Sequence, residues 1–147
     1  DLCFFATGFS KSQLLAVKPN EKDGTTKTKI AWRLARSSVP EKPSLLLIND
    51  HIYMIDDQGG LATCIAAITG EEIWSERIGG NYSASPITAN GRIYFFSEEG
   101  KTAVIEASPN FKRLAENKLA TGFMASPAVC DNSLILRTKT HLYRIGD

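Results

Sequence analysis

The chain has 147 residues, and its 17 Lys or Arg and 16 Asp or Glu residues give a formal net charge of +1. A nearly neutral chain has no sequence-wide attraction to nucleic acid or to anionic lipid. Hydrophobic residues make up 43% and charged residues 22%, a balance typical of a folded globular chain. No apolar run approaches the roughly 18 residues that would span a bilayer. The composition therefore predicts a folded domain without a transmembrane segment.

The first residues, Asp1 to Phe5, lack an initiator Met and the basic and apolar regions of a signal peptide. They predict a direct entry into a strand, in a chain that is a fragment or a mature form. Cys3, Cys64 and Cys130 lie far apart and show no metal-binding spacing. We interpret all three as small, buried, apolar thiols in strands.

A repeat of about 41 residues is the main signal in the sequence. Ser44, Ser85 and Ser126 follow one another at intervals of 41 residues, and Pro86 and Pro127 follow the second and third of them. Several apolar runs share this phase, among them the runs HIYMI, RIYFF and SLILR. The sequence is therefore built from successive copies of one structural unit.

The residue pattern within each repeat predicts β-strands. Runs of five or six residues rich in Ile, Tyr, Phe, Val and Thr alternate with turn residues such as Asn90-Gly91. The stretch 111–117 resembles an amphipathic helix by itself, but its place in the repeat predicts a strand. With the strands of one unit named A to D, we expect strands at 2–6, 13–18 and 30–34; at 44–48, 51–56, 61–66 and 72–78; at 85–89, 92–97, 101–106 and 112–119; and at 126–130, 133–138 and 140–145.

Four short antiparallel strands at this period describe one blade of a β-propeller. The run from Cys64 to Trp74 resembles the quinoprotein-type (pyrroloquinoline-quinone-like) repeat A-x-D-x-x-T-G-x-x-x-W, with Thr69, Gly70 and Trp74 matching. The run from Ser85 to Tyr94 is similar to the S-P-x-x-x-x-G-x-x-Y opening of a blade in that family. The WD-repeat propeller is the weaker alternative, since its Gly-His and Trp-Asp pairs are absent. We therefore expect an all-β partial propeller.

The resemblance assigns structural roles to the motif residues. Thr69-Gly70 would turn the chain between strands C and D, and Trp74 on the outer strand would cover the seam to the next blade. Trp32 would do the same in the first unit, and both Trp residues are interpreted as packing residues. The structural motif comprises Trp32, Thr69, Gly70, Trp74, Ser85, Pro86, Ser126 and Pro127.

We treat residues 1–147 as a single partial propeller domain. It contains a blade remnant at 1–36, blades at 44–79 and 85–120, and a blade remnant at 126–147. The first remnant lacks strand A and the last lacks strand D. The resemblance implies that a strand from the far N-terminus completes the last blade, so we expect the missing blades of the same parent chain upstream of residue 1.

The up-and-down order of strands places the B–C turns and D–A loops on one face, and the long insertion 19–29 on the other. Two D–A loops enter the A strands beside the central channel, and they carry the candidate binding surface. Its members are Asn81, Tyr82, Ser83, Phe123 and Met124. The alternative is that Tyr82 and Phe123 pack onto neighbouring blades.

The chain offers little catalytic chemistry. Asp56-Asp57 and Glu98-Glu99 occupy equivalent turns, but adjacent carboxylates on a turn usually diverge, and no Ca²⁺-binding loop pattern accompanies them. We predict no catalytic residue, cofactor or metal site. The main hypothesis is a non-enzymatic scaffold that binds a protein partner, and the resemblance implies a periplasmic or other extracytoplasmic location. The alternative is a fragment of a quinone-dependent dehydrogenase, with quinone and Ca²⁺ held by residues absent here.

Overall fold

The computed structural model describes residues 1–8, 11–19, 29–36 and 38–146. Within these residues the chain forms fourteen strands and no helix. The first sheet contains β1 (Cys3–Thr7), β2 (Gln13–Lys18) and β3 (Lys29–Ala35), and the second contains β4 (Leu46–Ile48), β5 (His51–Ile55), β6 (Leu61–Ala66) and β7 (Glu72–Arg77). The third contains β8 (Ile87–Ala89), β9 (Arg92–Phe96), β10 (Lys101–Glu106) and β11 (Arg113–Lys118), and the fourth contains β12 (Ala128–Cys130), β13 (Ser133–Arg137) and β14 (Leu142–Gly146).

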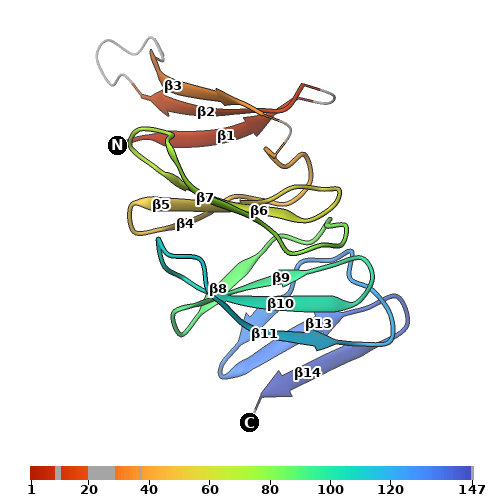
Figure 1. The fold of residues 1–147 in the computed structure, drawn as a ribbon. Coiled ribbons are helices and arrows are strands. Elements are labelled where there is room, and N and C mark those ends of the chain that lie inside the picture. Colours follow the sequence, from red (N-terminus) through yellow and green to blue (C-terminus); the bar gives the residue numbers. More distant parts are fainter. Residues whose placement is uncertain (9–10, 20–28, 37, 147) are drawn as a thin grey trace.

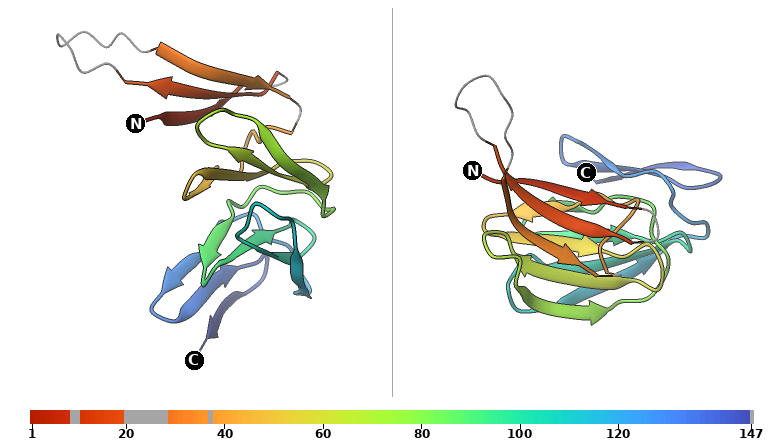
Figure 2. Two further views of the ribbon diagram at one scale, coloured as in Figure 1. Left: turned by 60° about the vertical axis from the view of Figure 1, so that its left-hand side comes forward. Right: turned by 90° about the horizontal axis from the view of Figure 1, so that it is seen from above.

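Each sheet is an antiparallel meander in which consecutive strands pair. The four sheets follow one another in chain order, as Figure 1 shows from the N-terminal to the C-terminal end. Figure 2 shows the same stack from two further directions. This is the arrangement of successive blades in a propeller, so the predicted fold class is confirmed. We refer to the four sheets as blades 1 to 4.

The strands lie within two residues of the positions that the repeat predicts. The ambiguous stretch 111–117 contains most of β11, so the repeat phase, and not the local amphipathic pattern, decided its structure. Much of the insertion 19–29 lies outside the described residues. The cysteine interpretation needs a correction: Cys64 is buried, but Cys3 and Cys130 are exposed because they lie in the two end blades.

The hydrophobic core lies in the three seams between successive blades. Strands β5 and β6 are apolar on both faces because blade 2 is covered on both sides. In the middle seam, Tyr53 and Ile55 of blade 2 pack with Ile93 and Phe95 of blade 3, and all four are at most 1% exposed. Full burial of one such side chain contributes about 1.5–3 kcal/mol. The seams therefore supply most of the stabilisation.

A row of three side chains, one from each of strands B, C and D, crosses each of the first three blades. In blades 1 and 2 the row runs aromatic, small, Trp, so that a small residue in the middle leaves room for the two rings. In blade 3 an Ala occupies the Trp position. The rows are Phe4–Ala16–Trp32, Tyr53–Cys64–Trp74 and Tyr94–Val104–Ala115.

Both Trp indoles reach across a seam to the next blade. The Trp32 Nε1–H donates to the Ala67 carbonyl at 3.1 Å, and the Trp74 Nε1–H donates to the Ser108 carbonyl at 3.4 Å. The two acceptors lie 41 residues apart, at the start of equivalent C–D turns. The Trp74 ring also meets Phe111 edge-on, with 5.1 Å between ring centroids. Each indole thus attaches its own blade to the outer turn of the next one.

The Trp32 ring packs against Gly70 of the next blade, and this position requires a glycine. Its φ of 75° lies in the left-handed region, and a Cβ at this position would sit 2.7 Å from the Trp32 ring. Thr69 closes the same turn because its Oγ1 accepts a hydrogen bond from the Glu71 N–H at 3.3 Å. The Thr-Gly pair of one repeat therefore receives the Trp of the preceding repeat.

We predict that Trp74→Ala lowers the free energy of unfolding by about 3–5 kcal/mol, because it empties part of the seam between blades 2 and 3. The matched control is Ile73→Ala, on the neighbouring residue, which is 38% exposed at a β-bulge. That change should cost about 1 kcal/mol or less. Urea melts followed by circular dichroism measure both values, and equal losses would contradict the assigned docking role.

Candidate binding face

The B–C turns and D–A loops lie at the same end of the blades, at the right of Figure 1. Backbone hydrogen bonds join them: the Tyr82 N–H donates to the Asp57 carbonyl at 2.9 Å, and the Glu98 N–H donates to the Asn81 carbonyl at 2.8 Å. The predicted pairing of these loops is therefore observed. We call this end the BC–DA face, and it comprises turns 56–60 and 97–100 with loops 38–45, 79–86 and 119–127.

The five residues expected to form the binding surface divide into two groups. Tyr82 is 0% exposed and Phe123 is 1% exposed, because their rings fill the second and third seams. The expectation of an aromatic surface is therefore corrected: these rings hold the loops down. Asn81, Ser83 and Met124 remain nearer the surface, and Met124 is 55% exposed.

The paired acids of the two B–C turns bind groups of the chain itself. Asp56 Oδ1 accepts the Leu61 N–H of its own turn at 2.7 Å. Asp57 accepts the backbone N–H groups of Glu41 at 2.6 Å and Lys42 at 3.1 Å, so it holds the preceding D–A loop. These two neighbouring carboxylates serve different loops, as expected for side chains that diverge on a turn.

The equivalent acids of blade 3 act in the same way. Glu98 Oε1 accepts the Ser83 hydroxyl hydrogen bond at 2.5 Å. Glu99 accepts hydrogen bonds from the Asn81 N–H at 3.2 Å and from the Asn81 side-chain amide at 3.0 Å. Glu98 and Glu99 therefore fix the loop that carries three of the candidate residues, Asn81, Tyr82 and Ser83.

Lys42 connects the polar groups of blades 2 and 3. Its Nζ lies 3.8 Å from an Asp57 oxygen, 3.8 Å from a Glu98 oxygen and 3.4 Å from the Ser83 hydroxyl. The side chain remains half exposed, so its ion pairs contribute little to stability. Lys42 balances part of the acidic charge at the point where two B–C turns approach each other. No pattern in the sequence singled it out.

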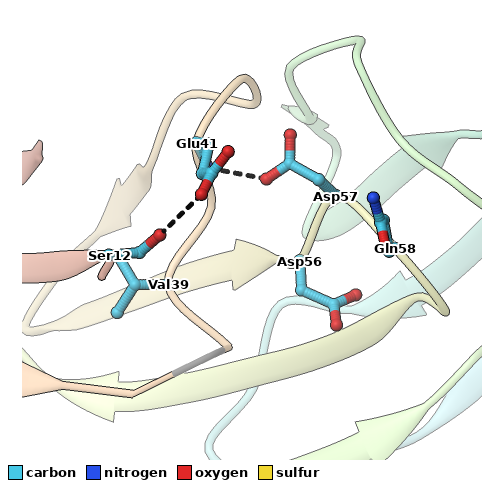
Figure 3. A pocket seen from close by; sticks show the side chains of 6 residues that line it. All are labelled: Ser12, Val39, Glu41, Asp56, Asp57 and Gln58. Atoms are coloured by element: carbon cyan, nitrogen blue, oxygen red, sulfur yellow. Dashed lines mark hydrogen bonds between the residues drawn. The ribbon is translucent and has the colours of Figure 1, made fainter. Parts of the chain in front are cut away.

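A polar pocket of about 410 Å³ opens on this face between blades 1 and 2. Figure 3 shows its lining, in which the Ser12 hydroxyl donates to Glu41 Oε1 at 3.2 Å and the Glu41 N–H donates to Asp57. The groups around it are acidic, and Val39 supplies an apolar wall. The lining residues are Ser12, Val39, Glu41, Asp56, Asp57 and Gln58.

The Ser residues of the repeat form a hydrogen-bonded series from blade to blade. The Ser44 N–H donates to Ser85 Oγ at 3.0 Å, and the Ser85 N–H donates to Ser126 Oγ at 2.9 Å. Pro86 and Pro127 follow these Ser residues and have no N–H of their own to satisfy. The spacing of 41 residues pointed to a repeat, but sequence reasoning missed this bond between repeats.

Two carboxyl groups of the face are shifted in opposite directions. Burial raises the pKa of Asp56, although its hydrogen bond from the Leu61 N–H opposes the shift. Burial also acts to raise the pKa of Glu99, but hydrogen bonds from the Asn81 N–H and the Ser97 hydroxyl outweigh it, so that the net pKa is lowered. Glu99 is therefore ionised in its role as an acceptor for Asn81.

Within residues 1–8, 11–19, 29–36 and 38–146, no three His, Cys, Asp or Glu side chains gather as a metal would require. His141 shares a 2.8 Å hydrogen bond with the Thr140 hydroxyl, away from these acids. In the same part of the chain, no helix has the length and apolar character needed to cross a membrane.

Comparisons with solved structures identify the fold. BamB from Moraxella catarrhalis matches 99% of this chain over 42% of its own length, with a TM-score of 0.73 and 15% identity. A europium-containing methanol dehydrogenase matches 80% of this chain over 23% of its own, with a TM-score of 0.62 and 14% identity. The chain has the fold of a quinoprotein-type β-propeller.

A computationally designed protein, Ika8, is similar over 97% of this chain and 45% of its own length, with a TM-score of 0.64 and 14% identity. This chain thus spans less than half the length of each of the three propellers. No family model and no curated protein sequence matches it. At these identities the similarity shows the fold alone, because one fold hosts many unrelated functions.

We predict that Ser85→Ala lowers the free energy of unfolding by about 1 kcal/mol, since the Ser44 N–H loses its acceptor. Ser85→Thr keeps a hydroxyl at the same place and serves as the matched control. Thermal melts of the two variants test the interpretation. An unchanged stability in Ser85→Ala, or an equal loss in Ser85→Thr, would show that the hydroxyl itself is not the important group.

The lowered pKa of Glu99 predicts a pH dependence. A carboxyl group whose pKa is lower in the folded state stabilises the protein above its unfolded pKa of about 4.3, and this contribution is lost as the pH falls through the folded value. Wild type should therefore exceed Glu99→Gln in stability at pH 7, and the difference should shrink by pH 3. Urea melts at pH 7, 5 and 3 measure it, and a difference that grows at low pH would contradict the shift.

Proposed function

We propose that this chain belongs to a non-enzymatic propeller that acts as a scaffold and binding module for another protein. The observation that carries this proposal is the use of Asp57, Glu98 and Glu99, all three of which bind loops of the chain itself. Acids engaged in this way give the BC–DA face a fixed shape. A fixed polar surface suits recognition, because little conformational entropy is lost when a partner binds.

The exposed groups of the face suit a protein partner. Met124 offers an adaptable apolar side chain, and Lys42 adds a charge at the junction of two blades. Further blades of the parent chain would also be partners of this chain, because they would extend the stack of blades. An extracytoplasmic location, periplasmic in a Gram-negative bacterium, is proposed from the resemblance of the repeat alone. The charge of +1 gives no support for a nucleic-acid partner.

A quinone-dependent dehydrogenase is the second candidate, favoured by the similarity to a methanol dehydrogenase. The described residues do not fit a quinone site. Trp32 and Trp74 lie in seams with their N–H groups bonded to carbonyls, so neither ring is available to stack on a quinone. The chain contains no adjacent Cys pair. Under this alternative, the groups that hold quinone and Ca²⁺ lie outside this chain.

Titration of the full-length parent protein with pyrroloquinoline quinone and Ca²⁺, followed by Trp fluorescence, separates the two functions. The scaffold proposal predicts no saturable quenching and no dye-linked oxidation of alcohols. Ca²⁺ alone and quinone alone are the controls for non-specific quenching. Saturable quenching that requires both components, together with alcohol oxidation, would overturn the scaffold proposal and favour the dehydrogenase.

A further inference from the structure

The second residue of a B–C turn reaches the neighbouring D–A loop on the BC–DA face. We call loops 38–45, 79–86 and 119–127 the first, second and third loop. Asp57 and Glu98 occupy this turn position in blades 2 and 3, 41 residues apart. Asp57 accepts two backbone N–H groups from the tip of the first loop, and Glu98 accepts a hydroxyl hydrogen bond from the tip of the second. Carboxylates therefore hold two of the loops.

Glu99, the next residue of the turn in blade 3, strengthens the contact with the second loop. It accepts hydrogen bonds from both the N–H and the side-chain amide of Asn81. Burial acts to raise the pKa of Glu99, but the Asn81 donors and the Ser97 hydroxyl outweigh it and lower the pKa. The conformation of the second loop therefore favours the ionised form of this carboxyl group.

The third loop is held without a carboxylate. The equivalent turn position in blade 4 is Lys139, whose ammonium group cannot accept a hydrogen bond. Instead, the Thr140 and Thr121 hydroxyls lie 3.4 Å apart, and the Phe123 N–H donates to the Ser97 carbonyl at 3.1 Å. Among the described residues, no side-chain carboxylate accepts a hydrogen bond from this loop. The third loop is therefore an internal reference for the other two.

The donor on the loop changes together with the acceptor on the turn. Ser83, which donates its hydroxyl to Glu98, is followed 41 residues later by Met124 in the third loop. A thioether has no hydrogen to donate. Where the repeat loses the carboxylate, it thus also loses the hydroxyl that the carboxylate would bind. The contact is a specific feature of the loops that have it.

The tips of the first and second loops can loosen while the loops stay anchored. Val39 and Tyr82 lie within two residues of the bonded tips and are at most 2% exposed, because their side chains fill the first and second seams. The Tyr82 N–H also donates to the backbone carbonyl of Asp57, a bond that does not depend on the charge of the Asp57 side chain. A change at the carboxylates therefore acts on the exposed tips.

The charges around the two loops leave these carboxylates as the groups that respond to acid. Lys42 Nζ lies 3.8 Å from both Asp57 and Glu98, and its positive charge favours their ionised forms. Asp56 holds its own turn through the Leu61 N–H. The other charged groups of the elements packed around the two loops are Glu41, Arg77, Lys101, Arg113 and Glu116.

Protonation weakens the hydrogen bonds that hold the two tips. Bonds to an ionised acceptor are about twice as strong as neutral ones, and a protonated carboxyl group presents a donor in place of one acceptor oxygen. We propose that the BC–DA face is a pH-sensitive surface: in acid, Asp57, Glu98 and Glu99 take up protons and the tips of the first and second loops loosen, while the third loop keeps its conformation. This inference rests on the proposed binding function, because it describes how partner binding at this face is regulated.

Hydrogen exchange of the full-length parent protein, measured by mass spectrometry on peptides that cover the three loops, tests the proposal. The comparison runs from about pH 5.5 to about pH 3, where carboxyl groups and not histidines change charge, so that His141 beside Thr140 does not contribute. After correction for the intrinsic exchange rate, exchange in the first and second loops should rise about fivefold to tenfold relative to the third. No rise in the first two loops, or an equal rise in all three while β5 and β6 stay protected, would overturn the proposal.

Neutral variants reproduce the acid state at pH 7, and they decide the question if the whole protein unfolds in acid. Asp57→Asn should speed exchange in the first loop, and Glu99→Gln should speed it in the second, so that each variant is a control for the other. Glu106→Gln removes one charge at the opposite end of β10 and should leave both loops unchanged. Wild-type exchange in Asp57→Asn and Glu99→Gln, or the same increase in Glu106→Gln, would overturn the proposal.

The failure of this inference and the failure of the proposed function give different results. Loops that do not respond to acid or to the neutral variants would remove the regulation and leave the scaffold proposal standing. Saturable binding of quinone and Ca²⁺ with alcohol oxidation would overturn the scaffold proposal, whatever the exchange of the loops.

Discussion

The contact between an outer-strand Trp and the outer turn of the next blade is the constraint on which the first two seams of this structure depend. Trp32 and Trp74 each donate an indole N–H to a backbone carbonyl across a seam, and Gly70 leaves space for the first ring. A blade alone is a small sheet with two apolar faces, and it buries them only by stacking against its neighbours. In these two seams the Trp contact joins the outer edges of neighbouring blades, while the aromatic and aliphatic side chains pack deeper in the seam.

Hydrogen bonds of polar groups also join successive blades, both at the inner strands and at the BC–DA face. Ser85 and Ser126 accept backbone N–H groups from the preceding blade, and Asp57 holds the loop that enters blade 2. Carboxylates used in this way support the shape of the surface and leave little free chemistry. This use of the carboxylates is the physical basis for the binding role proposed for the face.

The repeat changes toward its C-terminal end. Ala115 replaces the Trp of the outer strand in blade 3, and Arg144 replaces the buried Cys64 or Val104 position in blade 4. Both changes remove features that join one blade to the next.

The sequence alone determined the blade architecture, because period-2 runs, turn residues and a 41-residue spacing are patterns that recur in every repeat. It also indicated a structural role for Trp74 and correctly favoured a strand at β11 over a local helix pattern. Only the tertiary structure decided that Thr69-Gly70 receives Trp32, that Tyr82 and Phe123 are buried, and that Lys42 connects two blades. These facts depend on which residues meet across a seam, and a contact between residues about 40 positions apart leaves no pattern within either one's own repeat.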